Sequence, residues 1–350
     1  MYEVDFLPVE SGKGEGSKSG DAIAMRFDCQ SEGRRVVVVI DGGFSPIGDE
    51  LADHIEKYYQ TSQVDLVIST HPDQDHMNGL VTLVERLDVL ELMVHQPRKH
   101  VQDVSEFSNL EAVDNLLDAA RSQNALISEP FVGEERFGGQ LAILGPSESY
   151  YTSLIKQHLE EVREGAAKST ESALSLSFAQ LKKYLRSALD HVPFLETLSD
   201  DVVTGPRNST SAITLLKVDG ERMLFTGDAG IEALERAATY YEMRFGSFQA
   251  NPLDFFQAPH HGSRRNLGPT ILNRILGPRE APYLSERTAF ISSAKLSEKH
   301  PSPKVVNALK RRGCKVFATE RKTILHHNGL ARPGWIPIVP LSAMSEDYDD

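Results

Sequence analysis

The chain has 350 residues, of which 40% are hydrophobic and 25% are charged, and its formal net charge is −13. These values are typical of a globular protein with a sizeable core, and they exclude a disordered or fibrous chain. A surface this acidic repels polyanions at long range, which argues against broad electrostatic binding to duplex nucleic acid. A metal centre could still attract a phosphate locally, because bound ions are often the largest charges in their site.

Neither a membrane span nor a targeting signal is indicated. The longest apolar run, 36–40, is far shorter than a span, and Glu3 and Asp5 occur where a signal peptide would be basic. Cys29 and Cys314 are the only cysteines, whereas a secreted chain would more often carry several disulfides. We therefore expect a cytoplasmic protein without a membrane anchor.

Strand-like and helix-like stretches alternate along the first part of the chain. We predict strands at 22–27, 36–40, 64–69, 92–95 and 141–144, and helices at 80–87 and 110–120. The alternation stops at about residue 150.

Residues 150–190 favour a helix throughout, with apolar side chains at helical spacing, such as Leu154, Ile155 and Leu159. We interpret this segment as a helical insertion within a single domain that covers 1–345 and is followed by an acidic tail at 346–350. The insertion could pack on the scaffold, form a dimer contact, clamp a substrate or bind a partner protein.

The alternation resumes after the insertion. Strands are predicted at 211–218, 222–225, 254–258, 288–292, 316–318 and 323–326, and helices at 231–243, 270–276 and 302–312. Asp219-Gly220 is strongly favoured in two-residue hairpin turns, so it joins the first two of these strands. Two such alternating stretches predict an α/β fold in which mixed sheets are covered by helices on their outer faces.

The most informative segment is 70–76, directly after an apolar strand. His71, Asp73, Asp75 and His76 place four possible metal ligands within six residues. Imidazole and carboxylate together suit zinc, manganese or iron. The alternative is a polar turn whose carboxylates cap the following helix.

Two later segments also follow predicted strands. Asp228 offers a lone carboxylate that could bridge two metals, although an aspartate after glycine is often a helix N-cap. His260 and His261 are adjacent, so one could bind a metal while the other handles protons or substrate. A surface histidine pair is the competing interpretation.

In this order, on strand ends, these segments resemble the metallo-β-lactamase superfamily, and in detail the metallo-hydrolase domain of the ComEC competence proteins. The resemblance extends over nearly the whole chain except the insertion. It rests on Gly20-Asp21-Ala22-Ile23, Ile40-Asp41-Gly42-Gly43, residues 69–76 with Gly79-Leu80, Asn208-Ser209-Thr210-Ser211, Phe225-Thr226-Gly227-Asp228-Ala229, residues 258–263 and His300-Pro301-Ser302.

The resemblance implies an αββα sandwich and two divalent metal ions, zinc or manganese. One ion would be bound by Asp75, His76 and His260, with His260 preferred to His261. The other would be bound by His71 and Asp73, and Asp228 would bridge the two. Asp73 replaces the histidine that is common in the superfamily. Because carboxylates favour harder ions, manganese becomes more plausible at this second position.

The same resemblance implies hydrolysis by a metal-activated water. Asp75 would help to hold the hydroxide, and His261 or His300 would donate a proton to the leaving oxygen. His300 could equally belong to the start of the helix that follows it.

The expected function is that of a phosphodiesterase or nuclease acting on DNA or another nucleic acid, because the ComEC-type domains are thought to degrade one DNA strand. The acidic surface favours a single strand or an end over a tightly bound duplex. The alternatives are a hydrolase for a cyclic nucleotide, phosphoester or lactone, and a non-catalytic binding subunit.

Overall fold

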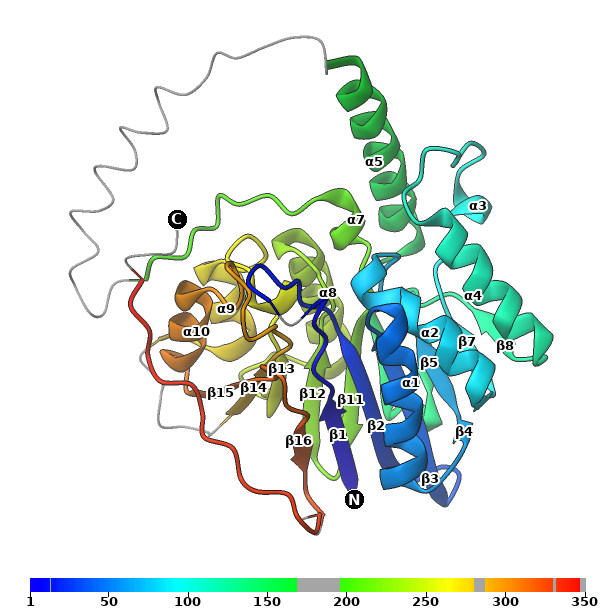
Figure 1. Ribbon diagram of the computed structural model, residues 1–350. Helices are drawn as coiled ribbons and strands as arrows, with labels where there is room; N and C mark the ends of the chain where they lie inside the picture. Colours follow the sequence, from blue (N-terminus) through cyan, green and yellow to red (C-terminus); the bar gives the residue numbers. More distant parts are fainter. Residues whose placement is uncertain (13, 169–195, 280–286, 330–331, 347–350) are drawn as a thin grey trace.

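A computed structural model describes residues 1–12, 14–168, 196–279, 287–329 and 332–346. Two β-sheets face each other, and helices cover the outer face of each (Figure 1). This arrangement confirms the α/β sandwich predicted from the sequence. Of the predicted helical insertion, 150–168 is described as part of one helix, and 169–190 lies outside the described residues.

The first sheet is antiparallel at one side and parallel at the other. In spatial order it contains β16 (Ile324–His327), β1 (Tyr2–Phe6), β2 (Ala22–Cys29), β3 (Arg34–Gly42), β5 (Leu66–Ile68), β7 (Glu91–Met93) and β8 (Leu126–Ser128). A short parallel pair, β4 (Gln63–Val64) and β6 (Asp88–Val89), lies beside it.

The second sheet is also mixed, with β12, β13, β14 and β15 parallel to one another. In spatial order it contains β15 (Cys314–Ala318), β14 (Arg287–Ile291), β13 (Phe255–Gln257), β12 (Glu221–Phe225), β11 (Ile213–Val218), β10 (Leu141–Gly145) and β9 (Glu135–Arg136). Asp219 and Gly220 both have positive φ, 52° and 85°, and join β11 to β12 as predicted.

Helices pack on both outer faces of the sandwich. The first sheet is covered by α1 (Ser45–His54), α2 (Gln74–Arg86) and α4 (Leu110–Ser122), and the second by α8 (Ile231–Phe245), α9 (Pro269–Leu276) and α10 (Pro303–Lys310) (Figure 1). Three further helices are α3 (Pro97–His100), α5 (Glu148–Lys168) and α7 (Pro206–Ser209), and single-turn helices span Ile55–Tyr59, Phe137–Gly139 and His260–Gly262.

Strand β3 shows how the sequence divides the core into layers. Val36, Val38 and Ile40 belong to the apolar layer between the two sheets. Val37 and Val39 belong to the layer beneath α1, α2 and α4. Successive side chains of a strand point to opposite faces, so an unbroken apolar run is buried on both sides.

Glycines bring α1 and α2 into backbone contact with β3. A Cβ atom on Gly79 of α2 would lie 2.0 Å from the carbonyl oxygen of Gly42, and one on Gly48 of α1 would lie 2.2 Å from that of Gly79. Only glycine permits this approach. The sequence prediction began this helix at residue 80, whereas α2 begins at Gln74, because Gly79 serves close packing instead of ending a turn.

The helix α5 belongs to a small apolar cluster of its own. Its Tyr151, Ile155 and Leu159 pack with Val104 and Phe107. Across the described parts of the chain, no helix is both long and apolar enough to cross a membrane.

A buried ion pair attaches the segment after residue 332 to the first sheet. Arg332 donates hydrogen bonds of 2.7 Å to both carboxylate oxygens of Asp5, and Tyr59 donates one of 2.7 Å. Burial alone would raise the pKa of Asp5, but hydrogen bonds from His54 and Arg332 outweigh it and lower that pKa. The ionised carboxylate is therefore the form that the fold stabilises.

We predict that Arg332→Met lowers the free energy of unfolding by about 3 to 5 kcal/mol at pH 7, because it leaves the Asp5 carboxylate buried without its main partner. A carboxyl group with a lowered folded pKa contributes stability above its unfolded pKa, and that contribution is lost as pH falls through the folded value. The difference between variant and wild type should therefore shrink below about pH 4. Urea unfolding at several pH values measures both effects, and the exposed Arg98→Met serves as a control with little change.

Candidate metal centre

The candidate site lies at one edge of the sandwich, where strands from both sheets end. Asp41 is near the carboxyl end of β3, and His71 follows the neighbouring parallel strand β5. Asp228 follows β12, and His260 and His261 follow its parallel neighbour β13. Because the carboxyl ends of parallel strands meet at the same edge, segments far apart in sequence come together here.

One group of four buried side chains converges within 4.8 Å. Its members are Asp21, His76, Asp228 and His261. Nε2 of His76 lies 3.3 Å from Oδ1 of Asp228, and Nε2 of His261 lies 3.9 Å from the same oxygen. Asp75 adds a second carboxylate, with its Oδ2 3.5 Å from Nε2 of His261. This set of nitrogens and oxygens is called the first subsite below.

A second set faces the other oxygen of Asp228. Nε2 of His71 lies 3.8 Å from Oδ2 of Asp228, and Nε2 of His260 lies 3.5 Å from it. Oδ2 of Asp73 lies 3.8 Å from Nε2 of His71. This set is called the second subsite below, and Asp228 presents one oxygen to each subsite.

Several of these atoms are buried without a hydrogen-bond partner. They are Nε2 of His71, Nε2 of His76, Nε2 of His261 and Oδ1 of Asp228. Leaving a buried polar atom unsatisfied costs about 1 to 3 kcal/mol, and most such atoms in native proteins are paired. These four orphaned atoms surround the carboxylate of Asp228, three at its Oδ1 side and Nε2 of His71 at its Oδ2 side. All are of ligand types used by divalent transition metals, so they fit a metal centre.

The Nδ1 atoms of His76 and His71, on the other side of each ring, have partners. Nδ1 of His76 lies 2.8 Å from Oδ2 of Asp41, which also accepts a 2.6 Å hydrogen bond from the hydroxyl of Thr70. Nδ1 of His71 lies 3.0 Å from the same Thr70 hydroxyl and 3.3 Å from that of Ser211. Such outer contacts fix the orientation of a ligating imidazole.

The electrostatic environment keeps the central carboxylate ionised. Burial would raise the pKa of Asp228, but His260, His76 and His261 outweigh it and hold that pKa well below its usual range. Burial and the neighbouring His76 lower the pKa of His71. An ionised carboxylate and a neutral imidazole are the forms that bind metals.

The first subsite opens into a cavity of about 320 Å³. The residues that line it include Asp75, His260, His261 and His300 together with Lys18, Glu298, Lys299 and the serines at 17, 19 and 297. Burial and the nearby histidines lower the pKa of His300 to about 3, so its ring is neutral near pH 7 and is a weak base.

Both capping interpretations of the sequence can now be decided. Asp73 occupies the N-cap position of α2, but its side chain makes no capping hydrogen bond. It forms an ion pair with Arg207 instead, with Nε 2.6 Å from Oδ1. The N-cap of α8 is Gly230, so the interpretation of Asp228 as a cap was wrong.

The family model of the metallo-beta-lactamase superfamily matches residues 32–280. The chain belongs to this superfamily. A comparison with curated proteins finds no match. The ComEC-type resemblance is finer than this family assignment and stays a prediction.

Two solved structures are similar to the chain, both at low identity. One, from Thermotoga maritima, is described as a candidate metallo-beta-lactamase and has 13% identity, a TM-score of 0.34 and coverage of 70% of this chain and 86% of that one. The other is a long form of RNase Z from yeast, with 9% identity, a TM-score of 0.37 and coverage of 93% of this chain and 41% of that one.

The sequence prediction placed His260 with Asp75 and His76. In the structure, His261 is the histidine that lies with them, and it is only 4% exposed. The side chain of His260 is 32% exposed and faces the second subsite. The physical reason is that both residues have positive φ, 49° and 57°, in a tight turn that aims adjacent rings in different directions. His300 lies near both, with its ring centre 5.6 Å from that of His260.

Sequence reasoning about the superfamily motifs assigned no site role to Asp21, Asp41 or Arg207. Asp21 enters the group of four, and burial raises its pKa. Its Oδ2 accepts a 3.0 Å hydrogen bond from Gln257. A usable sequence signal existed for Asp41, since it is a carboxylate directly after the apolar run 36–40. The structure adds that its φ is 57°, a conformation that non-glycine residues seldom adopt.

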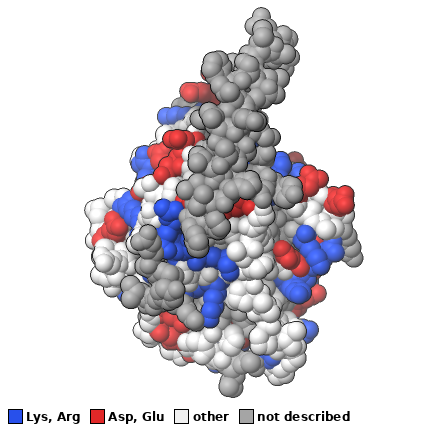
Figure 2. All heavy atoms as spheres, turned by 90° about the vertical axis from the view of Figure 1, so that its left-hand side faces the viewer, with Lys and Arg blue, Asp and Glu red and all other residues white. Residues whose placement is uncertain are grey.

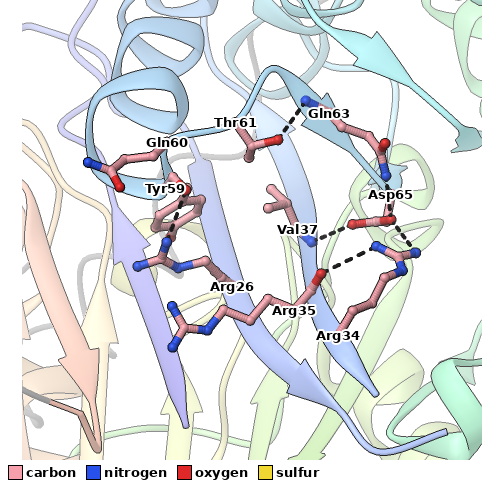
Figure 3. A pocket seen from close by; sticks show the side chains of 9 residues that line it. All are labelled: Arg26, Arg34, Arg35, Val37, Tyr59, Gln60, Thr61, Gln63 and Asp65. Atoms are coloured by element: carbon pink, nitrogen blue, oxygen red, sulfur yellow. Dashed lines mark hydrogen bonds and ion pairs between the residues drawn. The ribbon is translucent and has the colours of Figure 1, made fainter. Parts of the chain in front are cut away.

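A second cavity, of about 530 Å³, lies elsewhere on the first sheet and is lined by arginines (Figure 3). Arg34 and Arg35 are at the start of β3, whereas Asp41 is near its end. The guanidinium of Arg34 pairs with Asp65 at 2.7 Å, and that of Arg26 donates a 3.0 Å hydrogen bond to the carbonyl of Tyr59. The charges of these two arginines are already partnered, so we do not assign a function to this cavity.

We predict that Asp228→Asn lowers the affinity for divalent metal by at least about 10- to 100-fold, because it removes the charged oxygens shared by both subsites. Metal content after dialysis, measured by plasma mass spectrometry, checks this. The rise in melting temperature on adding metal should also be lost, since a metal stabilises the fold only where it binds the native state. Asp114→Asn, on the exposed surface, is the matched control, and equal metal content in both variants would contradict the prediction.

Proposed function

We propose that this chain is a metal-dependent hydrolase of phosphodiesters, acting as a nuclease on DNA or another nucleic acid. The observation that carries the proposal is the group of orphaned buried atoms from His71, His76, His261 and Asp228 beside an open cavity. Membership of the metallo-beta-lactamase superfamily supports hydrolytic chemistry. The phosphodiester substrate is our inference from the cavity and from the ComEC-type motifs.

We further propose that the site accommodates two divalent ions, zinc or manganese. The first would be held by Asp75, His76 and His261, and the second by His71, Asp73 and His260. Asp228 would bridge them, because its two oxygens face different subsites. An ion held there lowers the pKa of water and stabilises developing negative charge.

The chain's own residues would position the reactants. Burial would raise the pKa of Asp75, but the adjacent imidazoles of His261 and His76 outweigh it and lower that pKa, so this carboxylate stays ionised at the cavity. A weakly basic carboxylate suits holding a water or hydroxide better than removing a proton. The ring of His300, neutral near pH 7, lines the cavity beside His260 and would serve there as a hydrogen-bonding group for the substrate instead of as a base.

The charge distribution supports an anionic substrate at short range. Lys18 and Lys299 line the same cavity as His260, His261 and His300, together with the acidic Asp75 and Glu298. On the face shown in Figure 2, several Lys and Arg side chains gather near the middle, with Asp and Glu around them. The net charge of −13 is therefore not spread evenly over the surface, and basic side chains are available locally to contact a phosphate.

Two cellular features belong to the same proposal. Cys29 and Cys314 are buried and unpaired, which is compatible with a cytoplasmic location. A protein partner at the helical insertion, the single domain over 1–345 and the acidic tail at 346–350 stay predictions.

We expect Asp75→Ala to lower phosphodiesterase turnover by more than about 100-fold while the protein stays folded, because this carboxylate faces both the first subsite and the cavity. The measurement is cleavage of labelled single-stranded DNA, duplex DNA and bis(p-nitrophenyl) phosphate with manganese or zinc. Asp114→Asn is the control and should retain wild-type turnover.

The substrate panel separates the alternatives. Cleavage of the small ester without DNA cleavage would favour a small-molecule hydrolase. A metal-loaded protein that cleaves none of the three would favour a binding subunit and would contradict the proposed activity.

Lys18 and Lys299 should affect substrate binding more than chemistry. We expect the double replacement Lys18→Met and Lys299→Met to raise KM for DNA about tenfold with kcat nearly unchanged, because the lysines would contact the substrate equally in its ground state and transition state. The dependence of KM on salt should also weaken. Lys57→Met is the control, and a fall in kcat with constant KM would refute a binding role.

A further inference from the structure

Arg207 forms a two-point ion pair with Asp73 of the second subsite. Its Nε lies 2.6 Å from Oδ1 of Asp73, and its Nη2 donates a 3.1 Å hydrogen bond to Oδ2. Both oxygens of the carboxylate are therefore engaged by one guanidinium. The Nη2 contact is a hydrogen bond and the Nε contact is a close ion pair, so both oxygens face the same cation.

The backbone around Arg207 is held in place. Arg207 lies in α7, and its carbonyl accepts a 2.6 Å hydrogen bond from the hydroxyl of Thr210. The next residue, Asn208, has its side-chain nitrogen 3.5 Å from Oδ2 of Asp228 and 3.3 Å from Nδ1 of His260. The arginine is thus part of the wall of the second subsite and not a distant surface side chain that happens to reach it.

The two subsites differ in which groups approach their carboxylates. In the first, Asp75 is approached by Nε2 of His261, a group that can be neutral and share its lone pair with a metal. In the second, Asp73 is approached by a guanidinium, which has no acceptor atom and is always charged. A dication that enters between His71 and Asp73 must therefore displace or repel a resident cation.

We propose that Arg207 is the resident cation of the second subsite and makes metal binding there conditional. The first subsite fills tightly with one ion per chain. The second ion binds only when Arg207 releases Asp73, so its affinity is weaker and depends on this one side chain. The inference rests on the proposed function in that it uses the same metal centre, but it concerns loading and not turnover.

The test is metal stoichiometry in the full-length chain. Apo protein is titrated with Mn²⁺ and, separately, with Zn²⁺ by calorimetry, and retained metal is counted by plasma mass spectrometry after dialysis. We expect one retained ion per wild-type chain. In Arg207→Gln we expect two, with the affinity for the second ion raised by about 10- to 100-fold, as is usual for groups around a metal ligand.

A matched control uses another paired arginine. Arg98 also contacts both oxygens of one carboxylate, through hydrogen bonds from Nε at 3.2 Å and Nη2 at 2.7 Å to Asp114. Arg98→Gln removes the same charge and should leave one ion per chain. Arg207→Lys keeps the charge but loses the fork, and it should give a second affinity between those of wild type and Arg207→Gln.

A double variant shows where the extra ion binds. Adding Asp73→Asn to Arg207→Gln should return the count to one, because the carboxylate released by the first change is removed by the second. Circular dichroism and the melting temperature confirm that each variant is folded.

Several outcomes would overturn the inference. Two equally tight ions in the wild type would do so, as would an unchanged count in Arg207→Gln. If such a protein still hydrolyses phosphodiesters, only the inference fails and the proposed function stands. A folded wild-type chain that binds no ion refutes both.

Discussion

The close contact of three backbones through Gly42, Gly48 and Gly79 determines where the chemistry lies. Because α2 packs directly on β3, its first turn is held against the edge of the sandwich at which the strands end. Asp75 and His76 lie in that turn. A side chain at any of these glycines would push α2 outward and separate His76 from Asp41, to which it lies 2.8 Å away.

A carboxylate-rich edge is unstable unless its charge is compensated. Asp21, Asp41, Asp73, Asp75 and Asp228 all lie near the same strand ends, and like charges at such distances raise the free energy of the folded chain. The neighbours that offset this cost differ from one carboxylate to the next. Burial raises the pKa of Asp21, which lowers the cost of protonating it. Histidines lower the pKa of Asp228, and an arginine pairs with Asp73.

Much of the fold and part of the site could be predicted from sequence because the signals were local. The alternation of strand-like and helix-like apolar stretches predicted the layers of the sandwich, and Asp219-Gly220 predicted a hairpin turn. The density of His71, Asp73, Asp75 and His76 after a strand pointed to a metal centre, and the structure brings all four to one edge with Asp228.

The remaining features depend on contacts between distant segments. The sequence does not indicate a role for Arg207, because its contact with Asp73 joins residues that are 134 positions apart in the chain. Likewise, the choice between His260 and His261 depends on the backbone angles of one tight turn, which residue type does not determine. The predicted start of α2 was wrong because glycine in a sequence usually indicates a turn. In the structure, Gly79 lies within the helix and permits close backbone packing.

The candidate metal ligands and the cavity-lining residues come from different kinds of segment. Groups that would hold a metal stand on strand ends and on the first turn of a helix, where the two sheets fix their separation. Residues at the cavity opening, near 16–19 and 297–300, belong instead to loops of different parts of the chain. Loops vary in sequence at little cost to the core. Under the proposed function, substrate choice would therefore change through these loops while the candidate ligands on the strand ends stay the same. The candidate ligands would define the chemistry, and the loops around the cavity would define what it acts on.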